Sequence, residues 1–207
     1  MINMEIKTYK VGRLFTNCYL LVDNISKCAV MIDPGAEIDG IEDQISGLNL
    51  KYILLTHGHF DHILKAKKYR DVFGAKVVIS RLESEFTVDG FLNLSDRFLK
   101  PNIFESFNPD TLVDDEDELY FGKYKIKVLS TPGHTVGSLY YIIDNNIFSG
   151  DTLFKNQCGC TRFPTGSEDK MENSLKKLYS LEGDFNVYPG HGESTILSAE
   201  KNNHTGL

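Results

Sequence analysis

Side chains that can bind metal ions are concentrated in one short stretch of this sequence, LLTHGHFDHILK, which spans residues 54–65. The 207-residue chain has six histidines, and three of them lie here within six positions, together with an aspartate. Imidazole nitrogens and carboxylate oxygens are the donors that zinc, iron and manganese take at hydrolytic and oxidative sites. The stretch therefore offers four candidate metal ligands, which are His57, His59, Asp61 and His62.

Three later segments repeat one arrangement: an apolar strand-like run, a turn that contains glycine, and then a side chain able to bind a metal. These segments are IKVLSTPGH, NIFSGD and FNVYPGH, and they end in His134, Asp151 and His191. Side chains at the ends of neighbouring strands meet at one rim of a sheet, and glycine lets the backbone turn sharply there. We therefore expect all seven side chains to converge on one site.

Seven donors are too many for one tetrahedral ion. They suit a pair of divalent ions about 3.5–4 Å apart, each with about three protein ligands and sharing a carboxylate. The absence of thiolates from the set argues against a closed structural zinc site. We expect two divalent ions per chain, zinc first of all, with iron and manganese as alternatives.

The first half of the chain combines short strands with helices. Strands are predicted at residues 4–9, 18–22 and 29–33 as antiparallel neighbours, and at 51–56 and 75–80. A helix is predicted in 37–48, with Ile38, Ile41 and Ile45 on one face, and another from about 62 to 73. Residues 81–108 show no regular pattern.

The second half returns to strands, at 124–130, 138–143, 145–150 and 185–190, with a helix before the last of them. This helix should begin near Ser167, with Thr165 or Ser167 as its N-cap and with Met171, Leu175 and Leu178 on its inner face. Strands followed by a helix, twice over and without a linker between, predict a single α+β domain over residues 1–207.

Composition excludes several classes of protein. The net charge of −7 argues against a nucleic-acid-binding surface, which needs clustered Lys and Arg. No run approaches the roughly 18 apolar residues of a membrane span, and the N-terminus lacks a secretory core, so a cytoplasmic protein is expected. Four cysteines are too few for a disulfide framework, and Cys158 and Cys160 are expected to be free loop thiols whose role is open, as is the oligomeric state.

The ligand motifs resemble those of the metallo-β-lactamase fold hydrolases. THGHFDH matches the HxHxDH motif of that family, and PGHT, SGD and PGH match its later ligand motifs in order, so the resemblance covers essentially the whole chain. It implies a four-layer αβ/βα sandwich. It also implies a ligand set: His57, His59 and His134 for the first metal, Asp61, His62 and His191 for the second, and a bridging Asp151. Asp61 and Asp151 would then be the catalytic carboxylates.

Within this superfamily the sequence is most similar to the glyoxalase II-like group, the hydroxyacylglutathione hydrolases and their short bacterial relatives. The segments that carry this likeness are TNCYLL, IDPG, TPGHTVGSLYY, SGDTLF and VYPGHGESTI. The resemblance implies hydrolysis of a small-molecule acyl thioester of the S-lactoyl type by hydroxide formed at the metals. Asp33, in IDPG, is expected either to form a turn or to accept a proton from the outer nitrogen of a ligand histidine.

Two departures from the group concern the substrate. Glutathione-specific members carry an additional helical region at the C-terminus, whereas this sequence ends sixteen residues after His191. The short relatives show a pattern like GRTDFPGG where this chain has GCTRFPTGS, with Cys160 at the family's Arg position and Arg162 at its Asp position. Arg162 is expected either to contact a substrate carboxylate with its two-pronged guanidinium or to be an ordinary surface residue.

Two alternative functions remain at this stage. A persulfide dioxygenase of the same fold uses one iron held by two histidines and an aspartate, and those positions exist here as His57, His134 and Asp151. The other four ligands favour two metals and hydrolysis instead. A non-catalytic metal-binding module is the other alternative, and retention of every ligand argues against it.

Overall fold

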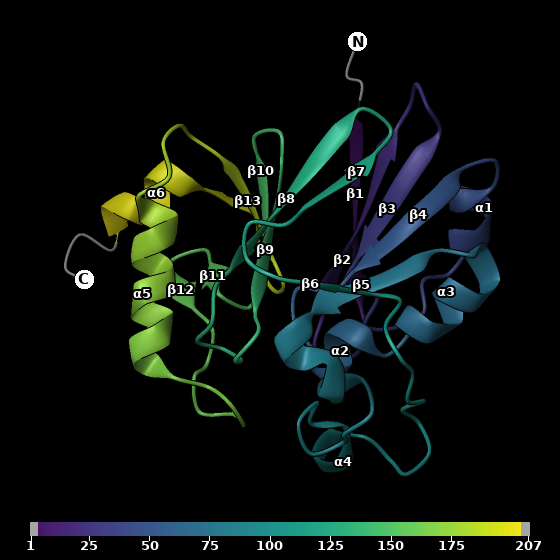
Figure 1. Cartoon of the computed structure of the whole chain (residues 1–207), viewed down its shortest axis with the longest axis horizontal. Coiled ribbons are helices and arrows are strands. Elements are labelled where there is room, and N and C mark those ends of the chain that lie inside the picture. Colours follow the sequence, from purple (N-terminus) through teal and green to yellow (C-terminus); the bar gives the residue numbers. More distant parts are fainter. Residues whose placement is uncertain (1–3, 204–207) are drawn as a thin grey trace.

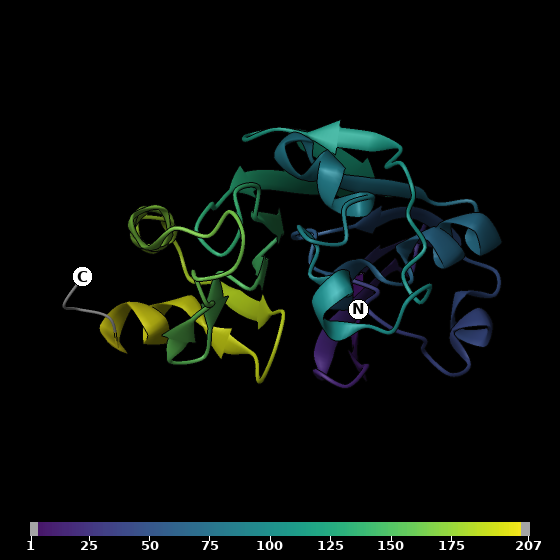
Figure 2. The same ribbon diagram turned by 90° about the horizontal axis from the view of Figure 1, so that it is seen from below.

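The computed structural model describes residues 4–203. Two six-stranded β-sheets pack face to face, and helices cover the outer face of each sheet (Figures 1 and 2). The predicted α+β class and the four-layer αβ/βα arrangement are confirmed. None of the helices within the described residues has the length and hydrophobicity that crossing a membrane requires.

The first sheet has its strands in sequence order, with antiparallel pairs from β1 to β3 and parallel pairs from β3 to β6. Its strands are β1 (Met4–Val11), β2 (Thr16–Asp23), β3 (Cys28–Ile32), β4 (Asn49–Leu54), β5 (Lys76–Ser80) and β6 (Thr111–Val113). The parallel order brings the segments that follow β4 and β5 to the same edge of the sheet.

The second sheet has the order β14-β13-β10-β9-β8-β7, and β10 and β13 are its parallel pair. Its strands are β7 (Glu118–Phe121), β8 (Tyr124–Ser130), β9 (Leu139–Ile143), β10 (Asn146–Gly150), β13 (Asn186–Pro189) and β14 (Thr195–Ile196). A separate hairpin pairs β11 (Leu153–Phe154) with β12 (Gln157–Cys158). All four cysteines are free thiols, as predicted.

Helices α1 and α3 lie beside the first sheet, and α5 and α6 lie beside the second (Figure 1). The helices are α1 (Ile41–Ile45), α2 (Phe60–Ile63), α3 (Ala66–Phe73), the 3-10 helix η1 (Arg81–Thr87), α4 (Ser95–Phe98), α5 (Glu168–Tyr179) and α6 (Leu197–Asn203). Ser167 is the N-cap of α5, and the inner face of that helix is the predicted one: Met171, Leu175 and Leu178 are buried.

Two helix predictions need correction. The predicted helix over 37–48 is only the five-residue α1, because Gly40 and Gly47 on either side of it adopt left-handed backbone conformations. The helix predicted from 62 to 73 is divided into α2 and α3. At the break the Lys65 N–H donates to the carbonyl oxygen of Pro34, 2.9 Å away, in place of the α-helical bond to the residue four positions earlier.

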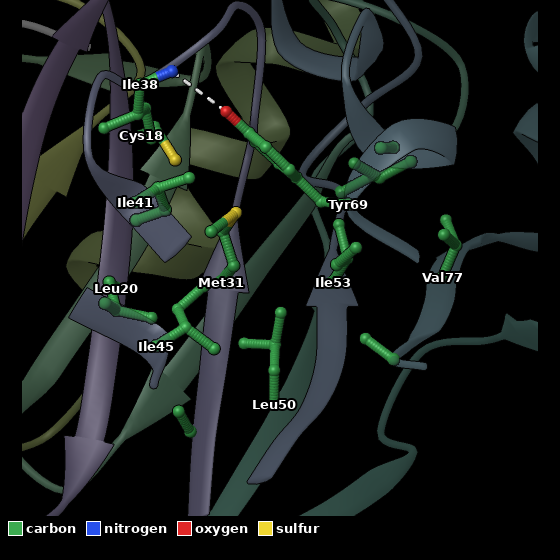
Figure 3. Close-up of a cluster of buried hydrophobic side chains, with 14 of the residues drawn as sticks. Cys18, Leu20, Met31, Ile38, Ile41, Ile45, Leu50, Ile53, Tyr69 and Val77 are labelled. Carbon is green, nitrogen blue, oxygen red and sulfur yellow. Dashed lines mark hydrogen bonds between the residues drawn. The ribbon is translucent and has the colours of Figure 1, made fainter. Parts of the chain in front are cut away.

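The side chains of β2 contribute alternately to two hydrophobic layers, one on each face of the first sheet. Cys18, Leu20 and Val22 pack against the helices on the outer face of the first sheet, whereas Tyr19 and Leu21 pack between the two sheets. Successive side chains of a strand point to opposite faces, and both faces are buried here. Figure 3 shows the outer layer, where Ile41 and Ile45 of α1 face Leu20 and Met31 of the sheet.

Removing one buried hydroxyl should destabilise this outer layer. The Ile38 N–H donates to the Tyr69 hydroxyl oxygen over 2.9 Å, and the bond is buried (Figure 3). Tyr69→Phe leaves that N–H without a partner, so the free energy of unfolding should fall by about 1–3 kcal/mol in urea denaturation. Tyr120→Phe, at an exposed tyrosine, is the control and should leave it within about 0.5 kcal/mol. Equal effects of the two substitutions would contradict this account.

Candidate metal centre

The HGHFDH stretch begins after β4 with two residues between, Leu55 and Thr56, and it runs through a turn into α2. His59 precedes α2 as its N-cap residue, so His57 and His59 lie in the turn while Asp61 and His62 lie on the helix. His57, His59 and His62 are each at most 3 % exposed. Four potential ligands of one short segment thus face the interior at the end of a strand.

The other three predicted ligands come from the second sheet. His134 follows β8, Asp151 follows β10 directly, and His191 lies just beyond β13. Backbone hydrogen bonds hold these strand ends to one another and to the first sheet: Gly190 N–H donates to Gly150 O, and Asn17 N–H of β2 donates to Gly190 O, each over 2.7 Å. The structure therefore brings all seven predicted side chains to the edge where the two sheets meet.

Three histidine nitrogens form the first group of donors. The Nδ1 atom of His59 lies 3.1 Å from Nε2 of His57 and 2.9 Å from Nε2 of His134. The three side chains are buried, and their ligand atoms lie close enough together to hold one ion.

Asp61, His62 and His191 form the second group. The Oδ2 atom of Asp61 lies 3.4 Å from Nε2 of His62 and 3.3 Å from Nε2 of His191. This group has two imidazoles and a carboxylate, so its charge differs from that of the first group.

Asp151 lies between the two groups. Its Oδ1 atom is 3.4 Å from Nε2 of His62, and its Oδ2 atom is 3.5 Å from Nε2 of His134 and 3.5 Å from Nε2 of His191. One carboxylate therefore reaches donors of both groups.

The outer nitrogens of several histidines are held by neighbouring groups. Nδ1 of His62 lies 2.9 Å from Oδ2 of Asp33. The same Oδ2 atom accepts a hydrogen bond from the Thr56 hydroxyl, and Oδ1 of Asp33 accepts one from the Thr56 N–H. The carbonyl oxygen of Cys160 lies 2.7 Å from Nδ1 of His134. The carbonyl oxygen of Leu14 lies 3.1 Å from Nδ1 of His191. Such contacts fix the ring orientation and direct the other nitrogen into the site.

Electrostatics divide the histidines into two kinds. Burial lowers the pKa of His57 and His59 well below the usual value, and neighbouring imidazoles add to the effect. Both rings are therefore neutral at pH 7, the form that binds a metal. Burial alone would also lower the pKa of His62, but the carboxylates around it outweigh burial and raise that pKa to about 10.

Asp61 also responds to its neighbours. Burial alone would raise the pKa of this carboxyl, but contacts with two histidines and with the Thr16 hydroxyl outweigh burial and lower it. The Thr16 hydroxyl donates to Oδ2 of Asp61 over 2.8 Å. Asp61 is thus ionised at neutral pH and available as a ligand.

The donor set fits a metal site on a further observation. Among the described residues, His62 Nε2 and Asp151 Oδ1 are buried side-chain atoms with no hydrogen-bond partner, and both point into the donor cluster. A buried polar atom without a partner carries a desolvation penalty, which coordination to a cation removes. Two such atoms side by side, one nitrogen and one oxygen, match the ligand preference of zinc, iron and manganese.

Sequence reasoning missed several residues that hold the ligands in place, namely Thr16, Thr56 and Glu83. Thr16 and Thr56 are the first residues of the motifs TNCYLL and THGHFDH, so their hydroxyls could have been proposed as partners of the ligands. Glu83 lies in RLESEF, where no motif or glycine turn indicates a site. It is fully buried in η1, where burial raises the pKa of its carboxyl to about 7, while the hydrogen bonds that it accepts from Gly58 and Gly137 favour the ionised form.

Two cavities flank the cluster. One, of 380 Å³, lies against Asp61 and is lined mainly by apolar side chains, among them Leu14, Phe60 and Phe98. The other, of 620 Å³, is lined by Cys158, Cys160 and Arg162 together with two carboxylates, Glu168 and Glu172. Arg162 itself is exposed, but the segment that carries it touches the first group of donors through the Cys160 carbonyl.

Comparison with known proteins agrees with this geometry. A family model described as the metallo-beta-lactamase superfamily matches residues 11–191. The hydroxyacylglutathione hydrolase GloC of Haemophilus influenzae is 34 % identical over 210 residues, which cover 99 % of this chain and 98 % of that protein.

Two solved structures are also similar. The crystal structure of the B3 metallo-beta-lactamase BLEG-1 has a TM-score of 0.89 and 32 % sequence identity, over 96 % of this chain and 97 % of that one. The crystal structure of TTHA1623 in a di-iron-bound form has a TM-score of 0.83 and 29 % identity, over 97 % and 100 % of the two chains. With a family model that spans most of the sequence and a relative that matches nearly end to end, this chain belongs to the metallo-beta-lactamase superfamily.

Proposed function

We propose that this chain is a binuclear metallohydrolase that cleaves acyl thioesters. The observation that carries the proposal is the position of Asp151, whose two oxygens each lie within 3.5 Å of a histidine nitrogen and together reach both groups of donors. A carboxylate shared between two sets of about three ligands is the arrangement of two-metal hydrolytic sites. Zinc is the proposed metal, with iron or manganese as alternatives.

Each side chain has a definite part in this proposal. His57, His59 and His134 would hold one ion, Asp61, His62 and His191 would hold the other, and Asp151 would be shared between the two. With a metal ion in place of the Nε2 proton, Asp33 would hold His62 with its Nε2 lone pair toward the site, because the Asp33 carboxylate accepts the proton of Nδ1. The Thr16 hydroxyl donates to Oδ2 of Asp61 and so fixes the orientation of that carboxylate.

Two divalent ions in this site would supply hydroxide at neutral pH and electrophilic stabilisation of the thioester carbonyl. The protein residues orient these ions and exclude water from their inner side, since most of the ligands are buried. No protein nucleophile is needed, which leaves Cys158 and Cys160 without a catalytic part.

The two cavities suggest how a thioester binds. The apolar cavity against Asp61 would take the apolar part of the substrate, and the guanidinium of Arg162 would contact a substrate carboxylate. The likeness to GloC, which is named a hydroxyacylglutathione hydrolase, places a glutathione thioester among the first substrates to test.

The test combines metal analysis with a substrate panel. The protein is purified without added metal, its metals are counted by elemental analysis, and thiol release is followed from S-lactoyl and longer S-acyl thioesters of glutathione, coenzyme A and N-acetylcysteamine. Two metals per chain with thioester turnover support the proposal. One iron per chain with oxygen consumption on a persulfide would instead identify a mono-iron dioxygenase, and full metal occupancy without turnover would identify a binding module.

Arg162→Ala should raise KM for a carboxylate-bearing thioester about tenfold with little change in kcat, because a charged hydrogen bond to the substrate is lost while the metal ligands remain. Arg70→Ala is the matched control, since Arg70 lies on α3 and contacts Asp71 and the Asn108 carbonyl. Steady-state kinetics of both variants test whether Arg162 contacts the substrate carboxylate. An unchanged KM in Arg162→Ala for every accepted thioester would exclude the contact.

A further inference from the structure

Glu83 is a carboxylate with no solvent exposure, placed where the backbone of η1 departs from helical geometry. Burying a carboxylate is unfavourable unless hydrogen bonds compensate for the lost water. The bonds that Glu83 makes therefore indicate what its burial accomplishes.

Both oxygens of Glu83 accept backbone N–H groups. Oε2 accepts from Gly58 over 2.5 Å, and Oε1 accepts from Gly137 over 3.0 Å. Gly58 stands between His57 and His59, and Gly137 lies three residues after His134. One side chain is thus bonded to both loops that carry the three-histidine group.

These two loops belong to different sheets. Gly58 follows β4 of the first sheet, and Gly137 precedes β9 of the second. The three ligand nitrogens lie within 3.1 Å of their neighbours across the same junction, so small movements of one sheet against the other would separate them. Productive metal sites need their ligands held within about 0.5 Å.

The close approach of η1 depends on glycine at both positions. A Cβ on Gly58 would lie 2.4 Å from the Cβ of Phe86, and a Cβ on Gly137 would lie 2.7 Å from the Cγ of Glu83. The two N–H groups can reach the carboxylate because neither residue has a side chain.

We propose that Glu83 is the positioning residue of the three-histidine site, joining the two ligand loops through its carboxylate. The inference rests on the proposed metal site. A carboxylate suits the role because it accepts on both oxygens, whereas a glutamine of the same shape has one accepting oxygen and presents an NH₂ group to the second N–H.

The chain supplies a matched control. Glu200 is another buried glutamate whose two oxygens accept separate groups, the Asn156 N–H at 2.8 Å and the Thr195 hydroxyl at 2.6 Å. Its bonds join segments that carry none of the three histidines. Glu200→Gln therefore repeats the chemical change of Glu83→Gln away from the three-histidine site.

The experiment measures metal release from protein loaded with zinc, by stopped-flow mixing with a chromogenic chelator, alongside the melting temperature. The release phase of the three-histidine site is assigned from its loss in His134→Ala. Glu83→Gln should weaken zinc binding at this site 10–100-fold and accelerate this phase accordingly, while the other phase and both phases of Glu200→Gln stay at wild-type rates.

Release from Glu83→Gln at wild-type rates, or equal acceleration in Glu200→Gln, would overturn the proposal and leave Glu83 a purely structural residue. If Glu83→Gln does not fold, Glu83→Asp decides by the same criterion, since its shorter side chain keeps the charge but cannot span both N–H groups. Wild-type protein that binds none of zinc, iron and manganese would instead refute the proposed function, so the two failures are distinguishable.

Discussion

Replacing Asp151 by asparagine is expected to lower kcat for thioester hydrolysis about 10³-fold. The carboxylate lies between the two groups of donors, with each oxygen within 3.5 Å of a histidine nitrogen. Asparagine keeps the shape of the side chain but replaces one oxygen with an NH₂ group, which cannot bind a cation, and it removes a negative charge. Steady-state kinetics and a metal count on the same preparation measure both consequences.

The matched control for this substitution is Asp144→Asn. Asp144 is exposed, lies in the turn between β9 and β10, and has a left-handed backbone conformation that asparagine also tolerates. The Asp144→Asn variant should keep the wild-type kcat and two metals per chain. An Asp151→Asn enzyme with two metals and kcat within threefold of wild type would show that Asp151 does not bridge.

Restoring metal to protein stripped by a chelator should raise the melting temperature by about 8–16 °C at a metal concentration about a thousand times the dissociation constant. Binding to the folded state alone at that concentration stabilises it by about 4 kcal/mol, and a chain of this size gains roughly 2–4 °C per kcal/mol. The physical reason is that three carboxylates and five histidines are packed together, and that Nε2 of His62 and Oδ1 of Asp151 are buried there without a hydrogen-bond partner.

Calorimetry with zinc, ferrous iron and manganese added separately tests this prediction and ranks the metals. Calcium serves as the control, because it prefers six to eight oxygen ligands and should shift the melting temperature by no more than a degree or two. A chain that melts at one temperature under all conditions has no stabilising metal site, and that result would falsify the binuclear assignment.

The ligands could be anticipated from sequence because each of the four ligand segments joins an apolar strand to a turn that contains glycine. His134, Asp151 and His191 follow β8, β10 and β13, and these three strands run in the same direction, so their carboxyl ends lie at one edge of the sheet. The inner face of α5 was readable for a similar reason, since Met171 and Leu175 are spaced at helical periodicity and Ser167 is a strong N-cap.

Other features depend on contacts that no local pattern records. The division between α2 and α3 arises because the Pro34 carbonyl takes the Lys65 N–H, and Pro34 is distant in sequence. The position of Glu83 behind Gly58 follows from the parallel pairing of β4 with β5, which places η1 beside the ligand loop. Neither the Lys65–Pro34 hydrogen bond nor the placement of η1 can be inferred from the helix and strand propensities of a short stretch of sequence.

The sequence by itself determined the α+β class, the identity of seven candidate ligands and their order along the chain, because strand periodicity, glycine turns and donor chemistry are local properties. The division of those donors into two groups around Asp151 was already implied by the family resemblance. Only the tertiary structure decided which atoms orient the donors, such as the Asp33 carboxylate, the Cys160 carbonyl and the Thr16 hydroxyl. These are contacts of about 3 Å between distant segments, and they exist only once two sheets have packed against each other in one register.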